Sequence, residues 1–228
     1  MKKSFSLIEL IIVIVIVAIL YSSINFTLSN TSLNQAADKL INHINYTRHL
    51  AIKDNKMQYY PINGSIIEMN RSKYWFKQWW QLRISKTSNG DYFYEIFSDS
   101  PTNSDSTNFN KIGSHINEFA IDPYNNLYMD GNYNNPNKKL NLSYYNIKKI
   151  LYNGNIFSSS IRIIFDGYGN CYISEGDKGD NGDINPYNII KREPLLDVAK
   201  ITLCQDDNCE TNISLCISPK IGNTYLCN

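Results

Sequence analysis

Residues 1–26 have the sequence MKKSFSLIELIIVIVIVAILYSSINF, and this stretch decides the fold. Lys2 and Lys3 precede a mostly apolar segment, residues 5–26, within which residues 10–20 are apolar without interruption. As a helix rising about 1.5 Å per residue, this segment would be roughly 33 Å long, which is enough to cross a bilayer core. The lysines before it favour a cytoplasmic amino terminus, with the rest of the chain across the membrane. We therefore expect a transmembrane helix over residues 5–26.

An acidic residue, Glu9, lies inside this apolar pattern. A carboxylate at mid-membrane costs about 2.5–3.5 kcal/mol, and less near the edge, so such a residue usually has a partner. A cleaved secretory signal peptide and a plain signal anchor both fit the apolar run, although residues 21–23 contain no clean A-x-A cleavage site. Neither of these interpretations explains Glu9.

Residues 4–10, SFSLIEL, resemble the processing site of type IV pilins and type II secretion pseudopilins. In that family, a prepilin peptidase removes a short basic leader before a Phe, the new amino group is N-methylated, and a Glu follows at the fifth mature position. The resemblance implies a leader over residues 1–4, cleavage between Ser4 and Phe5, and N-methylation of Phe5. The family usually has Gly before the cleaved bond, where this chain has Ser4.

The resemblance also implies an assembly role for Glu9. Its carboxylate would pair with the amino group of Phe5 on an adjacent subunit, which neutralises two charges in lipid and sets the register between subunits. The implied partners are other pilin or pseudopilin subunits, the prepilin peptidase and an inner-membrane assembly platform. The implied location is the bacterial inner membrane, with a single span and a head in the periplasm or outside, before assembly into a pilus or pseudopilus.

A helical pattern continues over residues 27–57. Apolar residues recur at steps of three and four, which is typical of a helix with one buried face. No Gly occurs before Gly64 and no Pro before Pro61, so nothing forces a break between residues 5 and 57. We expect one helix of about 78 Å, whose second half packs on a sheet. The expected buried positions are Leu33, Ala37, Leu40, Ile41, Ile44 and Ala51.

The remaining residues, 58–228, predict a β-rich head. The chain contains 31 Asn and 17 Tyr, a composition that favours turns and short strands over long helices. Alternating side chains predict strands over residues 74–85 and 91–97, paired through a type I′ turn at Asn89-Gly90. The expected fold class is therefore α+β and pilin-like, with a long helix packed on an antiparallel sheet. Further strands are expected over residues 161–165, 171–174, 200–204, 212–217 and 224–227.

Four of the five cysteines lie within the last 25 residues. Cys204 and Cys209 flank a four-residue turn, and a turn near residues 221–222 would place Cys216 opposite Cys227. We therefore expect disulfides Cys204–Cys209 and Cys216–Cys227, with Cys171 free, in an oxidising compartment. The alternative is that all five are reduced and partly buried.

An acidic, Gly-rich segment over residues 175–185 is a candidate calcium loop. Asp177, Asp180 and Asp183 could supply carboxylate oxygens to a hard cation, and major pseudopilins of the resembled family carry a calcium loop near their carboxyl terminus. The aspartates are spaced by three residues, whereas EF-hand ligands are spaced by two. A solvated surface loop is the alternative, and no other cofactor is expected.

One face of the first predicted strand combines aromatic and basic residues: Trp75, Lys77, Trp79 and Arg83. Such a face can stack the bases of single-stranded nucleic acid, but it is more often packed within the protein or against a neighbouring subunit. The net charge of +1 gives no support for a nucleic-acid partner.

The remaining motifs are weak. His43, His49 and His115 have no metal-ligand or catalytic spacing, so we expect structural or exposed roles for them and no enzyme. Asn70 and Asn212 lie in acidic glycosylation sequons that chance would also produce in so Asn-rich a chain. The expected function is that of a structural subunit, favoured as a minor one, of a type IV pilus or of a secretion or competence pseudopilus. The alternatives are a DNA-capturing minor pilin and a membrane-anchored extracytoplasmic binding domain that never polymerises.

Overall fold

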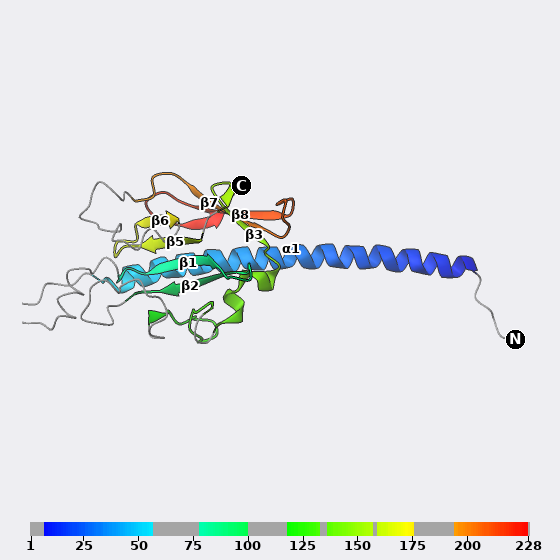
Figure 1. The fold of residues 1–228 in the computed structure, drawn as a ribbon, viewed down its shortest axis with the longest axis horizontal. Helices are drawn as coiled ribbons and strands as arrows, with labels where there is room; N and C mark the ends of the chain where they lie inside the picture. Colours follow the sequence, from blue (N-terminus) through cyan, green and yellow to red (C-terminus); the bar gives the residue numbers. More distant parts are fainter. Residues whose placement is uncertain are drawn as a thin grey trace, which may run out of the picture.

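The fold was analysed in a computed structural model that describes residues 7–56, 78–99, 118–132, 136–156, 159–175 and 194–227, with only the backbone of residues 22–30. Helix α1 (Leu7–Lys53) contains 47 residues and lies within the helix expected over residues 5–57. Its first half extends away from the rest of the molecule, and its second half runs along the strands (Figure 1). The helix ends where the Asp54 N–H donates to the Leu50 carbonyl, with the basic Lys53 in the last turn.

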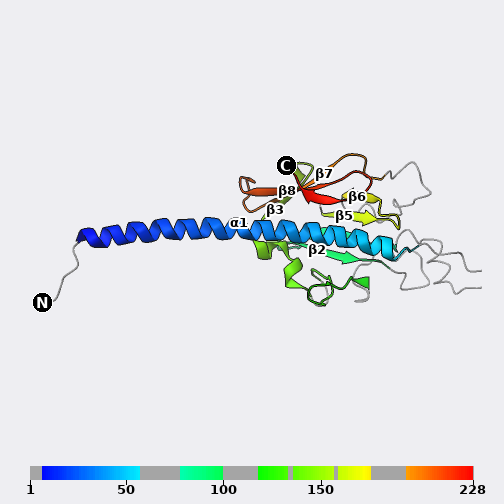
Figure 2. The same cartoon turned by 180° about the vertical axis from the view of Figure 1, so that it is seen from behind.

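The described strands form two antiparallel sheets. The first has the order β2-β1-β5-β6 and the second has the order β4-β3-β7-β8-β9. Seen from both sides, β7 and β8 lie on one side of α1 and β2 lies on the other (Figures 1 and 2). Two 3-10 helices, η4 (Lys138–Leu140) and η5 (Leu142–Tyr145), precede the second sheet. The strands are β1 (Gln81–Lys86), β2 (Tyr92–Phe97), β3 (Lys149–Tyr152), β4 (Asn155–Ile156), β5 (Ser160–Phe165), β6 (Cys171–Glu175), β7 (Ala199–Cys204), β8 (Asn212–Ile217) and β9 (Thr224–Leu226).

The expected antiparallel pairings β1–β2 and β5–β6 are present, and the three carboxyl-terminal strands agree with β7, β8 and β9. Two details differ. Strand β1 begins at Gln81, whereas a strand was expected from residue 74. Gln78–Trp80 precede the strand, and residues 74–77 lie outside the described part of the chain. The turn is not type I′, which needs positive φ at two residues: Gly90 has φ of 96°, but Asn89 is not left-handed. The Gly90 N–H donates to the Thr87 carbonyl, which makes a longer loop closed by a left-handed glycine.

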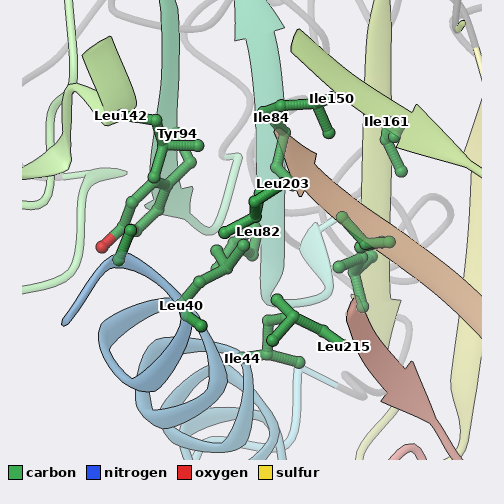
Figure 3. Close-up of a cluster of buried hydrophobic side chains, with 14 of the residues drawn as sticks. Leu40, Ile44, Leu82, Ile84, Tyr94, Leu142, Ile150, Ile161, Leu203 and Leu215 are labelled. Carbon is green, nitrogen blue, oxygen red and sulfur yellow. The ribbon is translucent and has the colours of Figure 1, made fainter. Parts of the chain in front are cut away.

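The core lies between the second half of α1 and the strands (Figure 3). Leu40 and Ile44 point from the helix towards Leu82 of β1 and Leu215 of β8 (Figure 3). The predicted stripe is confirmed: Leu33, Ala37, Leu40, Ile44 and Ala51 are buried, and Ile41 is partly buried. Ala36, His43 and Thr47 are also buried, so the covered face of the helix is wider than the apolar pattern.

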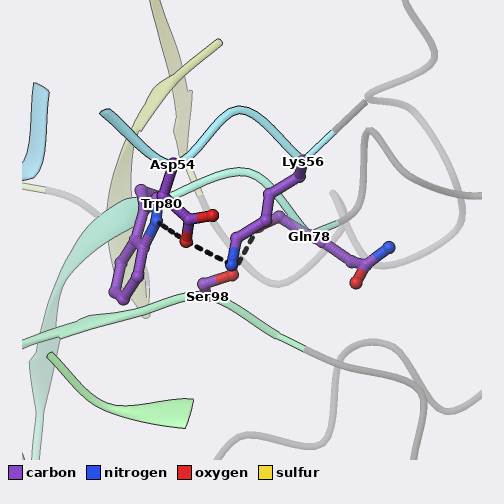
Figure 4. Close-up of polar contacts among 5 residues, drawn as sticks. All are labelled: Asp54, Lys56, Gln78, Trp80 and Ser98. Atoms are coloured by element: carbon purple, nitrogen blue, oxygen red, sulfur yellow. Dashed lines mark hydrogen bonds and ion pairs between the residues drawn. The ribbon is translucent and has the colours of Figure 1, made fainter. Parts of the chain in front are cut away.

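Polar contacts also hold α1 and the residue after it against the strands. The side-chain amide of Asn45 accepts from the Thr224 N–H (3.2 Å) and donates to the Thr224 carbonyl (3.3 Å), which satisfies both backbone groups of the first residue of β9. At the end of the helix, the Trp80 Nε1–H donates to Asp54 Oδ2 (3.0 Å), and the same oxygen forms an ion pair with Lys56 (Figure 4). These contacts fix the helix on both sheets.

Candidate functional site: the projecting part of helix α1

The first part of α1, residues 7–21, presents large apolar side chains around its whole circumference. Their exposed fractions range from 49% at Val13 to 78% at Leu7. A helix that is apolar on every side is normally covered by protein or lipid, because exposed apolar surface is costly in water. The segment extends beyond the strands in both views (Figures 1 and 2). This surface therefore requires an apolar environment that the described strands do not provide.

Glu9 lies in the first turn of α1, with an exposed side chain among these apolar residues. A carboxylate at this end of a helix interacts favourably with the positive end of the helix dipole. Ser4 and Phe5, the expected cleavage and methylation positions, lie outside the described residues. Within the described part of the chain, no helix has the length and apolarity that a membrane span requires.

The two expected disulfides are present. Cys204 bonds to Cys209 with a Cα–Cα distance of 4.9 Å, and Cys216 bonds to Cys227 at 5.2 Å. The first closes the turn between β7 and β8, and the second links β8 to the residue after β9. Cys171 is free and buried, as expected, and burial raises the pKa of its thiol to about 12, so the thiolate is rare at neutral pH.

The strand face considered for nucleic-acid stacking is buried where it is described. Trp79 is 4% exposed and stacks on Tyr172, with ring centroids 5.4 Å apart. Arg83 is 8% exposed and forms an ion pair with Glu95. Trp75 and Lys77 lie outside the described residues. The two described side chains are part of the packed interior, so they offer no open platform for a base.

The Arg83–Glu95 pair is a feature that the sequence reasoning missed. Arg83 of β1 lies directly opposite Glu95 of β2, and Arg162 of β5 lies on the other side of Arg83. Burial raises the pKa of Glu95 to about 7, although Arg83 acts in the opposite direction. The expected two-residue turn at Asn89-Gly90 would place Ile84 opposite Glu95, so the pair depends on the shifted register that the longer loop produces.

The histidines have no common site among the described residues. His43 is buried, and its Nδ1 lies 2.7 Å from the Tyr94 hydroxyl oxygen. Burial lowers the pKa of His43 to about 4, so the ring is neutral at neutral pH. His49 is exposed on α1, whereas His115 is outside the described residues. The structural role expected for His43 agrees with this placement.

The candidate calcium ligands Asp177, Asp180 and Asp183 lie outside the described residues, as does Asn70. In the ranges that are described, no group of three His, Cys, Asp or Glu side chains is arranged to hold a metal ion. Asn212 is exposed at the start of β8, and its side-chain amide donates to the Cys209 carbonyl.

Comparison with known proteins adds nothing to this geometry. No protein-family model, no curated protein and no solved structure matches the chain. The described residues combine an exposed apolar helix with a body held by two disulfides. Chemically, this arrangement can insert a helix into an apolar phase and present a folded body outside it.

Proposed function

We propose that this chain is a minor structural subunit of a filament of the type IV pilus or type II secretion or competence pseudopilus kind. The observation that carries the proposal is the contrast between the two parts of α1. Leu7 to Tyr21 are exposed and apolar on every side, whereas the stripe from Leu33 to Ala51 is buried by the protein's own strands. The first part of the helix thus serves as an anchor in an apolar phase, and the second part packs in the core of the folded body.

The proposal explains why the apolar part continues directly into the packed part. Before assembly, the apolar part lies in the bacterial inner membrane as a single span with the body outside. During assembly, the helices of neighbouring subunits replace lipid around it, so the apolar surface stays covered at every stage. In such an assembly, one surface of each subunit contacts a different surface of the next subunit. This head-to-tail contact, repeated along the chain of subunits, produces an open helical filament.

Glu9 has a specific part in this process. Peptidase cleavage before Phe5 produces a new ammonium group near one end of the apolar segment. The Glu9 carboxylate of one subunit pairs with the Phe5 ammonium of the next, so only one axial position between neighbours neutralises both charges. Such a buried pair contributes little net stability, but it strongly disfavours other registers.

Mass spectrometry of the amino-terminal peptide of the exported protein tests the proposal. We expect a peptide that begins with N-methylated Phe5. A protein that retains Met1, or one cut after Ser22, would overturn the proposal. An intact Met1 would favour a membrane-anchored domain that never polymerises, and a cut after Ser22 would favour a secreted protein.

A further inference from the structure

An open groove of about 520 Å³ lies between α1 and two turns of the body, away from the apolar part of the helix. Asp38, Lys39 and Asn42 line it from α1, over a little more than one helical turn. The opposite wall includes Tyr124 and Tyr144. A volume of this size is within the range of about 300–1,000 Å³ that is common for small-molecule sites.

The two tyrosines at the groove are unusually exposed for side chains of their size. Tyr124 is 79% exposed and Tyr144 is 70% exposed. A tyrosine ring combines a flat apolar face with a hydroxyl group, so an exposed ring beside a polar groove can stack on one side of a ligand and hydrogen-bond to its edge. Neither ring contributes to the hydrophobic core of the described residues.

Both rings are held on rigid turns. The Tyr124 N–H donates to Asp122 Oδ1 (2.9 Å), and the Asn126 N–H donates to the Asp122 carbonyl (2.9 Å), which closes the turn that carries Tyr124. Tyr144 belongs to η5, whose first turn is capped by the Asn141 side chain accepting from the Ser143 N–H (2.8 Å). The backbone that carries each ring is therefore ordered before a ligand arrives, which lowers the entropy that binding costs.

The charges around the groove balance. Lys39 and Lys139 contribute two positive charges, and Asp38 and Asp122 contribute two negative charges. An anionic ligand would meet both carboxylates, and a cationic ligand would meet both ammonium groups. A nucleic-acid strand needs a positively charged groove. An apolar ligand would cover the polar groups that every lining residue carries without giving them hydrogen-bond partners, which is costly. A neutral ligand rich in both donors and acceptors is the best match for these walls.

The α1 wall has spare hydrogen-bonding capacity. His43 is 1% exposed, and its Nδ1 is engaged with the Tyr94 hydroxyl at 2.7 Å. Its other ring nitrogen, Nε2, is buried and has no hydrogen-bond partner among the described residues. Because buried polar atoms are normally satisfied, a hydroxyl group or water brought in by a ligand would complete this site.

From these observations we propose that the groove binds a short, neutral oligosaccharide. A sugar ring has a flat C–H face that stacks on tyrosine, and its hydroxyl groups both donate to carboxylates and accept from lysine and amide N–H groups. The site is separate from the apolar part of α1, so this proposal is independent of the proposed filament role.

Saturation-transfer NMR and calorimetry on the full-length protein test the proposal, with chitotriose, cellotriose and maltotriose as probes. The detergent should carry a phosphocholine head group, because a maltoside head group would compete for the groove. We expect at least one probe to bind, and the variants Tyr124→Ala and Tyr144→Ala each to weaken its binding about three- to tenfold through lost stacking.

The variant Tyr168→Ala is the matched control. Tyr168 is 82% exposed on the turn between β5 and β6 and does not line the groove, so its loss should leave binding unchanged. Failure of all three probes to bind would overturn the proposal. Binding that is unaffected by both groove variants, or weakened equally by Tyr168→Ala, would also overturn it.

Discussion

Glu95 illustrates, at the scale of single residues, how a buried carboxyl group can couple strand pairing to pH. It has no exposed surface and lies opposite Arg83 in the β1–β2 register. Its surroundings include a second arginine, Arg162, which favours the charged form, and Asp130, which disfavours it. Burial is the largest effect, and it raises the pKa of Glu95 from 4.5 to about 7.

This shift predicts the direction of a pH effect on stability. Between about pH 4.5 and pH 7, the folded protein holds a proton on Glu95 that the unfolded chain has released, so the Glu95 contribution to stability falls as pH rises through this window. Replacement by Glu95→Gln should remove this dependence. We expect the free energy of unfolding of the native protein, relative to Glu95→Gln, to decrease by about 3 kcal/mol across the window.

Thermal melts followed by near-UV circular dichroism, at a series of pH values, measure this difference. Taking the difference between two proteins cancels the effect of His43, whose lowered pKa acts in the opposite direction as pH falls. Glu210→Gln, at an exposed position on the loop before β8, is the control and should follow the native protein. A pH-independent difference between native protein and Glu95→Gln would contradict the prediction.

A second prediction at the scale of single residues concerns Glu9. If it pairs with the terminus of a neighbouring subunit, Glu9→Ala should leave cleavage before Phe5 intact and reduce incorporation into filaments. A loss of about 1.4 kcal/mol of interaction free energy between subunits corresponds to a tenfold reduction in the equilibrium constant for incorporation. Quantitative immunoblots of sheared filaments against total cellular protein measure it, with Asp38→Ala as a control on the packed part of α1. Normal incorporation of Glu9→Ala would exclude the assembly role.

At the scale of elements, regular patterns could be predicted from the sequence, and contacts between distant segments could not. The stripe from Leu33 to Ala51 and the strands β7 and β8 have clear helical and strand patterns, so their positions were expected. The turn at Asn89-Gly90 was misassigned because this dipeptide also occurs in a longer loop, in which Thr87 faces Asp91 and Gly90 is left-handed but Asn89 is not. The burial of Trp79 depends on Tyr172, far along the chain, and no local pattern encodes that contact.

The bridge between Asn45 and β9 is one such distant contact, and it predicts a local effect. Thr224 is 4% exposed, so Asn45→Ala would leave its N–H and carbonyl groups buried without their side-chain partner. We expect a loss of about 1–3 kcal/mol in unfolding free energy. Relative to the native protein, Asn45→Ala should accelerate amide hydrogen exchange more in β9 than in β1. The control is Asn42→Ala, an exposed Asn about one turn earlier, which should change neither quantity.

For the whole molecule, the division of α1 separates the part that packs in the body from the part that projects beyond it. Among the described side chains, the core includes helix residues from Leu33 onward, and the described body has two sheets and two disulfides of its own. Burial of one Val, Leu or Ile side chain stabilises by roughly 1.5–3 kcal/mol, so covering the exposed apolar residues from Leu7 to Leu20, which lie outside the described core, would be strongly favourable.

A variant that begins at residue 28 should therefore be a soluble monomer with the same sheets and disulfides, whereas the full chain should need detergent. Sedimentation velocity measures the association state. The masses of tryptic peptides under non-reducing conditions identify the disulfides. The melting temperature of the shortened protein should match that of the full chain in detergent, because none of the removed residues whose side chains are described belongs to the core. As a control, a variant that begins at residue 38 loses Leu33, Ala36 and Ala37 and should melt at a lower temperature. Aggregation of the first variant at low concentration would show that the projecting helix is needed to fold the body, and the separation of anchor from body would then be wrong.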